Sequence, residues 1–341
     1  MRVPILLQQD DVEDSIPTEV EMAESIIGLK EGNAGVPLSM RVEDLKGWIQ
    51  KATRKKYQLR RRWEILVIFI QQKFGDRTPP EERAWDTMVL ILKVKGGFWG
   101  IGIVKLAWKI CSAVVNCWLT WGFVLHNALH EFILERGTRM ATLEAKISQQ
   151  LDGKEHDPLF QVLLDICKAY DSLCRGWYLK VLQGYGLGRN LAWLLTSYWD
   201  RHHIVPKTGK FLGKDFWTRG GLTKGDPASP MIFNIVVYVV EWAVLGVVHG
   251  TQDEQHGLVC AAGEMNLISY VDDVRILRWN HDWVQDALLE TVEMFCRMGL
   301  EIIIENNQGH VLHSRSCLGG VREASVQATG NGIRRNVSVE E

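Results

Sequence analysis

A Cys-x-x-Cys pair, a recognisable signal peptide and sequence repeats are all missing from this sequence of 341 residues. Its seven cysteines are scattered, with neither a Cys-x-x-Cys pair nor the spacing of a zinc site, so we expect free thiols in a reducing compartment. Residues 1–15 mix Gln and Asp into a few apolar side chains, a pattern that does not predict a signal peptide. The length suits one large domain or two smaller ones with a sizeable core.

An excess of positive charge is missing as well, since the formal net charge is −2 at pH 7. That value is low for an enzyme that acts on nucleic acid, but the distribution of charge matters more. Basic side chains gather on one predicted helix, interleaved with Trp48, Tyr57 and Trp63: Lys51, Arg54, Lys55, Lys56, Arg60, Arg61 and Arg62. Such a mixture suits phosphate contacts and base stacking. A solvated helix face is the alternative interpretation.

Two adjacent carboxylates, Asp272 and Asp273, stand between the apolar runs 267–271 and 274–277. Alternation and β-branching on either side predict a tight hairpin with the acidic pair at its tip, where short acidic side chains tolerate the backbone angles. Acidic residues in a turn are more often simply solvated. The pair alone is therefore weak evidence for a metal site.

A second acidic strand lies upstream and strengthens the metal interpretation. The apolar run 160–165 has the length of a strand and ends in Asp165. A short apolar run of this kind predicts a buried strand. If this strand lies beside the hairpin, Asp165 comes next to Asp272 and Asp273. Carboxylate oxygens are the ligands that Mg²⁺ prefers.

A glycine-rich segment, residues 220–230, lies between the two acidic strands and runs into the apolar stretch 231–248. Ser229 as N-cap and Pro230 at the first helical position predict the start of a helix. Glycines allow close approach of a backbone or a nucleotide, and a helix N-terminus offers unpaired N–H groups. An ordinary loop before a core helix is the alternative.

The order of these features resembles the palm of reverse transcriptases, and most of all the polymerases of non-LTR retrotransposons and group II introns. Segments 41–48 and 90–110 look like the fingers of such proteins, and 136–138 like a basic turn that they carry. Segment 298–302 is similar to their next palm motif. The resemblance covers roughly residues 25–312.

The resemblance implies an α+β fold with right-hand polymerase fingers and palm, an antiparallel palm sheet packed on helices, and no thumb. We expect an acidic, poorly ordered leader over 1–30 and a mainly helical fingers region over 31–150. The palm is expected over 151–312 and a polar, disordered tail over 313–341. The expected helices are 18–29, 173–184, 190–200, 231–248 and 282–298, with a strand pair near 88–94 and 101–104.

The resemblance also implies roles for single residues. Asp165, Asp272 and Asp273 would hold two Mg²⁺ ions, or Mn²⁺ as an alternative, with Asp273 either a ligand or a partner of a ligand. Tyr170 stands where the family has an aromatic residue under the nucleotide sugar; a core tyrosine is the other interpretation. Further contacts to the nucleotide would come from Lys93, Lys224 and Gly225, and contacts to nucleic acid from Arg54, Lys55, Lys56, Arg60, Arg61 and Arg62.

Three departures from the family pattern surround the expected nucleotide site. Trp99 stands where an arginine would contact the triphosphate, and an indole cannot pair with phosphate oxygens. Lys224 replaces the usual glutamine. Asn306 stands near the place of a lysine that would protonate the pyrophosphate, a role that asparagine cannot fill.

Three functional hypotheses follow. The first is an RNA-directed DNA polymerase that uses an RNA template, a DNA primer and dNTPs, inside the cell, nuclear or cytoplasmic, and not secreted. The second is a catalytically impaired remnant that only binds nucleic acid. The third, a membrane-associated or structural protein, rests on the apolar stretches 106–125 and 231–248 alone. Glu241 inside the latter makes a membrane span unfavourable, so no membrane is expected.

Overall fold

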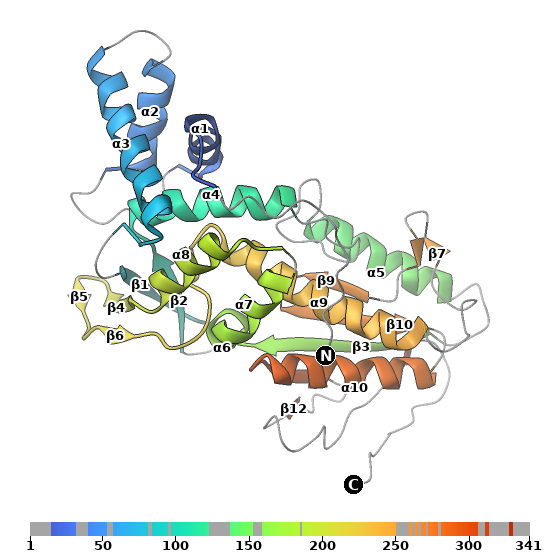
Figure 1. Cartoon of the computed structure of the whole chain (residues 1–341). Helices are drawn as coiled ribbons and strands as arrows, with labels where there is room; N and C mark the ends of the chain where they lie inside the picture. The colour runs from blue at the N-terminus through green and yellow to red at the C-terminus, as the bar shows by residue number, and fades with distance from the viewer. Residues whose placement is uncertain are drawn as a thin grey trace. The chain divides into compact units, whose positions relative to one another are not determined.

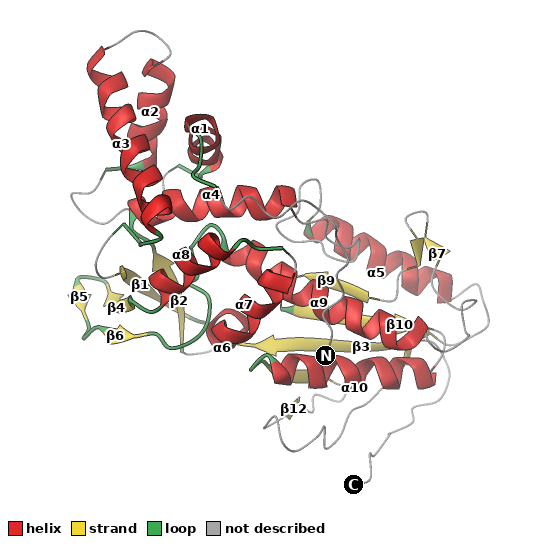
Figure 2. Ribbon diagram, in the orientation of Figure 1, coloured by secondary structure: helices red, strands yellow, loops and turns green. Residues whose placement is uncertain are grey.

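The computed structural model describes most of the chain, with gaps between the described ranges. These ranges are 15–31, 40–52, 57–80, 84–94, 97–122, 137–152, 159–184, 186–249, 259–260, 263–264, 267–270, 272–278, 281–305, 311–313 and 327–329. Helices and strands alternate irregularly along the sequence, so the fold is of the α+β class (Figures 1 and 2). This agrees with the class expected from the sequence.

The chain forms two compact units, each built from two segments. The first unit comprises Met1–Val124 and Leu179–Ile232, and the second comprises Leu125–Tyr178 and Phe233–Glu341. The expected boundary near residue 150 does not coincide with this division, and neither unit is continuous in sequence.

Helices make up much of both units (Figure 2). They are α1 (Glu19–Gly28), α2 (Val42–Ala52), α3 (Tyr57–Asp76), α4 (Leu106–Gly122), α5 (Thr138–Asp152), α6 (Ala169–Ser172), α7 (Arg175–Gly184), α8 (Arg189–Trp199), α9 (Ser229–His249) and α10 (His281–Arg297). Helix α1 begins after a capping box, in which Thr18 accepts from the backbone of Glu21 and the Glu21 side chain accepts in return. None of the helices in the described ranges has both the length and the apolar character that a bilayer crossing needs.

The sheet of the first unit joins segments far apart in sequence. Strand β1 (Ala84–Leu92) pairs antiparallel with β2 (Phe98–Ile103) and parallel with β4 (His202–Thr208), as Figure 1 shows. The short strands β5 (Phe211–Leu212) and β6 (Phe216–Trp217) both pair antiparallel with β4. The sequence predicted the pair β1 and β2 but not β4, β5 or β6.

The sheet of the second unit is antiparallel, with the strand order β12, β11, β3, β10, β9. The strands are β3 (Leu159–Cys167), β9 (Leu267–Tyr270), β10 (Asp273–Arg278), β11 (Glu301–Glu305) and β12 (Val311–His313), and β13 (Gln327–Thr329) pairs with the start of β3. A separate ribbon joins β7 (Val259–Cys260) to β8 (Gly263–Glu264). Most of the tail that was expected to be disordered lies outside the described residues, and β13 falls within it.

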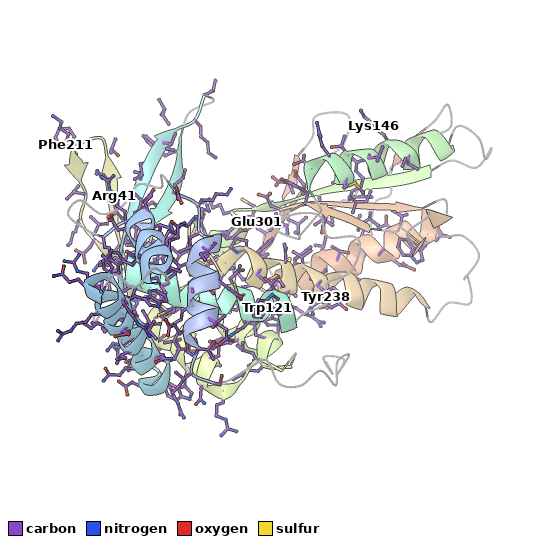
Figure 3. All side chains as sticks on the ribbon, turned by 90° about the horizontal axis from the view of Figure 1, so that it is seen from above. Arg41, Trp121, Lys146, Phe211, Tyr238 and Glu301 are labelled. Carbon is purple, nitrogen blue, oxygen red and sulfur yellow. The ribbon has the colours of Figure 1, made fainter. Side chains whose placement is uncertain are left out.

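The alternation of side chains along β3 gives this sheet two different faces. Val162, Leu164 and Ile166 are buried, and helix α10 packs against β3, β10 and β11. Leu163 and Asp165, on the other face, are only partly covered. Helix α5 contacts β9, and in Figure 3 the strands lie between α5 and α10. The catalytic candidates are therefore on the face that helix α10 leaves open.

Strand β3 is longer than the sequence predicted. It does not end at Asp165 but continues to Cys167, because Ile166 and Cys167 pair with Ile302 and Glu301 of β11. Asp165 thus lies inside a strand that has hydrogen-bonded neighbours on both sides. A position in a central strand holds the backbone of this residue more firmly than a position at a strand end.

Candidate active site

Asp165 and Asp273 face each other across two neighbouring strands. The register of β3 and β10 places them directly opposite, with Leu164 opposite Val274 on the next rung. Directly opposite residues of an antiparallel pair project from the same face, with Cβ atoms about 4.5–5.5 Å apart. Asp165 is half-buried and Asp273 is exposed. We refer to these two residues as the carboxylate pair.

Asp272 stands beside the carboxylate pair, in the turn between β9 and β10. Its backbone oxygen accepts a hydrogen bond of 2.9 Å from the backbone N–H of Ile166. Because Tyr270 pairs with Asp273, Asp272 lies in the turn, and Asp273 is already the first residue of a strand. The prediction that both carboxylates sit at the tip of the hairpin is therefore wrong for Asp273.

The carboxylate pair lines a cavity of about 660 Å³ in the second unit. Its walls are formed by α5 and by the strands β3, β9 and β10, and the Thr138 hydroxyl donates a hydrogen bond of 2.9 Å to the Tyr270 hydroxyl. Lys146 and Arg275 also line it. A cavity with two carboxylates and two cations is a polar site rather than a gap in the core.

Arg275 is the cation closest in register to the carboxylate pair. It lies two residues beyond Asp273 on the same strand, opposite Leu163. Its side chain therefore projects from the same face of the sheet as the carboxylate pair. Burial lowers the pKa of the guanidinium, and the Asp273 carboxylate opposes this shift. Asp273 therefore has a cationic neighbour on its own strand, β10, whereas Asp165 lies on β3.

The carboxylate pair offers fewer ligands than a metal site built entirely from protein side chains. Among the described residues, no group of three or more His, Cys, Asp and Glu side chains lies close enough together to hold a metal ion. Mg²⁺, however, is usually bound by one or two protein carboxylates together with waters and substrate phosphates. The donor set on the sheet face therefore fits Mg²⁺ shared with a nucleotide, and does not fit an all-protein cage.

Tyr170 lies in α6, directly after β3. Its ring stacks on Phe233 of α9 with centroids 5.2 Å apart and planes at 19°, and the residue is half-buried. The chain enters α6 through Lys168, a non-glycine residue with φ 50°. A left-handed conformation of this kind is unfavourable for a side chain of this length and is concentrated at functional turns.

The glycine-rich segment 220–230, called the glycine loop from here on, packs against β2 in the first unit. Gly225 has φ +97°, and a Cβ atom there would lie 2.2 Å from the backbone oxygen of Gly102. A Cβ atom on Gly102 would in turn lie 2.2 Å from the backbone oxygen of Lys224. Two glycines are thus required where the loop meets the strand.

Asp226 fixes the end of the glycine loop. It is 5% exposed and accepts hydrogen bonds from the Ser112 hydroxyl and, at 3.4 Å, from the Trp108 indole. Ser112 accepts from the backbone N–H of Ala228 at 3.0 Å. Burial raises the pKa of Asp226 to about 7; the Ser112 hydrogen bond opposes the rise and the Asp86 charge adds to it.

A second buried carboxylate, Asp86 of β1, links this region to β4. The Tyr198 hydroxyl donates to its Oδ2 at 2.5 Å, and Nε2 of His202 lies 2.8 Å from the same oxygen. Because a carboxylate only accepts, Nε2 is the donor in this pair. Nδ1 of His202 lies 2.7 Å from the Thr218 hydroxyl, and the Thr223 hydroxyl of the glycine loop lies 3.5 Å from Nε2.

The remaining nucleotide candidates lie in the first unit. The backbone N–H of Lys93 donates to the oxygen of Gly97 at 3.0 Å, which closes the hairpin of β1 and β2. Lys224 is half-buried in the glycine loop. Trp99 lies in β2, opposite Ile91. These residues lie in the first unit, and the carboxylate pair lies in the second.

The basic cluster lies partly on α3. Arg60, Arg61 and Arg62 are exposed there; Arg60 pairs with Glu64 at 2.8 Å, and the Arg62 guanidinium lies 6.0 Å from the Trp48 ring. The expectation that Trp63 is available for stacking is wrong: it is 2% exposed, and its indole donates to Glu19 at 2.7 Å. Three members of the cluster and one further candidate lie outside the described residues: Arg54, Lys55, Lys56 and Asn306.

Sequence reasoning missed the buried network around Asp86 and the cation Arg275. Asp86 stands in an apolar run between Trp85 and Thr87, and a charged residue in such a run is the signal that was available. Its partners His202 and Tyr198 are more than a hundred residues away. No local pattern predicts which distant side chain completes such a network.

Comparison with known proteins places the chain near retroelement proteins. It is 26% identical over 156 residues to the retrovirus-related Pol polyprotein of the type-1 retrotransposable element R2 of Popillia japonica. That match covers 45% of this chain and 24% of the relative, so the chain spans about a quarter of its length. No family model matches.

One solved structure with a similar chain path is apo telomerase from Candida tropicalis, truncated from the C-terminal domain. It is 14% identical, with a TM-score of 0.46, and the match covers 71% of this chain and 52% of that one. The sequence similarity to the R2 polyprotein agrees with the order of the acidic strand, the glycine loop and the Tyr-x-Asp-Asp hairpin. The chain contains a reverse-transcriptase-like domain.

Proposed function

We propose that this chain is an RNA-directed DNA polymerase domain of a retroelement, which transfers a nucleotide from a dNTP to the 3′-hydroxyl of a primer on an RNA template. The observation that carries this proposal is the carboxylate pair, two aspartates that lie opposite each other on the face of an antiparallel sheet that α10 does not cover. Asp272 lies in the adjoining turn. The similarity to the R2 polyprotein supports the same reaction class.

Nucleotidyl transfer needs compensation of the negative charge that builds up on the phosphoryl oxygens. Bound divalent ions supply this compensation and activate the attacking hydroxyl. Asp165 and Asp273 would hold such an ion together with the triphosphate, and Asp272 would add an oxygen from the turn. Arg275, on the same face, would attract a phosphate group and balance the charge of Asp273.

Nucleotide selection would depend on further residues, which come from both units. The Tyr170 ring is braced by Phe233 at 5.2 Å, so it would present a fixed surface to the sugar and disfavour a 2′-hydroxyl. The glycine loop would approach the base pair with its backbone, since Gly225 carries no side chain. Lys93 and Lys224 would supply positive charge to the triphosphate.

A catalytically impaired remnant that binds nucleic acid is the second candidate. It is favoured by Trp99, which stands opposite Ile91 in β2 and cannot make the charged contact that an arginine would make. In both candidates the protein acts inside the cell on nucleic acid.

The test is extension of a DNA primer on an RNA template by the purified chain, with and without Mg²⁺. Asp165→Asn and Asp272→Asn should each abolish extension, because each removes a charge that the ions need. Asp282→Asn, which alters an exposed carboxylate at the start of α10, is the matched control and should extend like the wild type.

Each outcome separates the two candidates. Extension that is lost in Asp165→Asn but kept in Asp282→Asn supports the polymerase. A folded wild type that does not extend, but gains extension when Trp99→Arg and Asn306→Lys are combined, supports the remnant. Extension that persists in Asp165→Asn contradicts the proposed metal site.

A further inference from the structure

The sheet of the first unit is covered on only part of one face. Asp86 and Ile204 lie on that face and are 2% and 8% exposed, whereas Phe211 and Phe216 of the same face are 83% and 46% exposed. Alternate residues point to the opposite face, and there Ile101, Leu212 and Trp217 are 47%, 67% and 52% exposed. These three belong to β2, β5 and β6, so the exposure extends across the sheet.

The register identifies the other members of this exposed face. His203 is paired with Trp217, and Lys207 with Leu212 and with Val89 of β1. We call this surface the open sheet face and define it by Val89, Ile101, His203, Lys207, Leu212 and Trp217. Exposed apolar groups that are contiguous across several strands mark interaction surfaces more often than scattered ones do.

Planar groups stand side by side on the open sheet face. The rings of His203 and Trp217 are nearly parallel, with planes at 9° and centroids 6.5 Å apart. The Arg219 guanidinium lies 5.9 Å from the centre of the Trp217 ring. An imidazole, an indole and a guanidinium are the side-chain groups on which nucleobases stack.

Positive charge surrounds these planar groups. Residues 201–219 contain five cations, Arg201, Lys207, Lys210, Lys214 and Arg219, and a single carboxylate, Asp215. That carboxylate is engaged, since its Oδ2 lies 3.4 Å from Nδ1 of His203. The whole chain, by contrast, has a net charge of −2. The local excess of cations therefore favours a polyanion as the partner.

We propose that the open sheet face binds an unpaired strand of nucleic acid, whose bases stack on Trp217 and whose phosphates contact Lys207 and Arg219. Sheet surfaces with exposed aromatics and flanking cations bind single strands in this way, with little dependence on sequence. Both RNA and DNA offer this chemistry. A duplex does not, because its bases are already stacked in pairs.

This proposal goes beyond the proposed polymerase activity and does not depend on it, because binding needs neither a metal ion nor a dNTP. It also differs from the basic cluster on α3, where Trp63 is buried.

The experiment measures fluorescence anisotropy of labelled twelve-nucleotide RNA, DNA and duplex probes with the full chain, without Mg²⁺. Trp217→Ala should weaken single-strand binding about tenfold, because stacking of one base on an aromatic residue is lost. Trp217→Tyr should restore most of the affinity. Trp121→Ala is the matched control, because Trp121 of α4 is 61% exposed, and it should bind like the wild type.

A charge variant tests the second half of the proposal. Lys207→Ala should reduce the dependence of affinity on salt by about one phosphate contact, whereas Trp217→Ala should leave that dependence unchanged. Equal thermal stability of the variants and the wild type ensures that binding, not folding, is compared.

Three results would overturn the proposal. One is single-strand binding that is unaffected by Trp217→Ala. Another is a duplex probe that binds as tightly as the single strands. The last is binding to vesicles of phosphatidylserine and phosphatidylcholine that is lost in Trp217→Ala while oligonucleotide binding is unchanged, which would make the open sheet face a membrane-contacting surface.

Discussion

The glycine loop and the carboxylate pair are held by different kinds of contact. In the first unit, Asp86 and Asp226 are buried, and their hydrogen bonds connect β1, β4, α4 and α8 to the loop. In the second unit, Asp165 and Asp273 stand on a partly exposed sheet face, and the strands are held by backbone pairing and by the apolar face beneath.

This difference predicts different effects of mutation in the two regions. Removing a buried hydrogen-bonding group leaves its partners unsatisfied, which lowers the free energy of unfolding. Removing a charge from a carboxylate on a partly exposed sheet face costs little stability, because water still reaches the replacement. Mutations near the glycine loop should therefore act through folding, and mutations in the carboxylate pair through chemistry.

The largest contrast is expected between Asp165→Asn and Asp86→Asn. If the proposed metal site is right, the first should reduce primer extension at least about 100-fold with an unchanged melting temperature, because it removes only a charge on a partly exposed face. The second should destabilise the first unit by about 3 kcal/mol, because Tyr198 and His202 lose a charged acceptor. Thermal melting and primer extension on both variants check this, and equal melting temperatures for the two would contradict the comparison.

Gly225→Ala should have the next largest effect. A Cβ atom at this position would meet the Gly102 oxygen at 2.2 Å in a backbone conformation with φ +97°, which should cost about 2–4 kcal/mol. Gly47→Ala in α2 is the control, because a Cβ atom there meets nothing within 4 Å, and it should stabilise by about 0.5–1 kcal/mol. Urea unfolding of both variants measures the difference; if Gly225→Ala were as stable as the wild type, the packing of the loop on β2 would be wrong.

A smaller effect is expected from pH acting on Asp226. Its pKa of about 7 in the folded protein exceeds the ordinary value of 3.8, so the native state binds a proton that the unfolded chain releases. Stability from this group is present at low pH and falls as pH rises through the range from about 4 to 7. Asp226→Asn lacks this titration and should gain stability relative to the wild type between pH 5 and pH 8. Urea unfolding at the two pH values tests it; a constant difference between the two proteins would show that the carboxylate does not titrate in this range.

The smallest effect is expected at the exposed end of the basic cluster. Arg61→Ala should lower RNA affinity a few-fold and reduce its salt dependence by about one phosphate, with no change in melting temperature. Arg189→Ala, which removes an exposed arginine from the start of α8, is the control. Anisotropy titrations at several salt concentrations measure both, and equal losses in the two variants would mean that the cluster is only a solvated helix face.

Local patterns predicted the elements that depend on neighbours in sequence. Helix α9 begins at Ser229, where the Ser-Pro pair indicated a start, and α10 spans 281–297 against an expected 282–298. The hairpin of β9 and β10 was predicted from alternation. Its turn was assigned one residue too far, because the cross-strand pairing of Tyr270 and Asp273 decides where the strand begins.

Features that depend on distant residues were not predictable in the same way. Strand β4 has a proline and few apolar residues, and it becomes a strand because β1 pairs with it from far away in the sequence. The opposition of Asp165 and Asp273 could be anticipated only because the two strands resemble a known arrangement. Their metal-binding role and that of Asp272 remain predictions.

The parallel pairing of β1 with β4 also constrains how the protein is synthesised. β1 lies in the first segment of its unit and β4 in the second, with part of the other unit between them along the chain. As the chain leaves the ribosome, β1 is synthesised before β4, and Asp86 before its partner His202. Until then a strand edge and an unpaired carboxylate are exposed, which slows folding and invites aggregation. A fragment that stops at residue 150 would keep β1 without its partner.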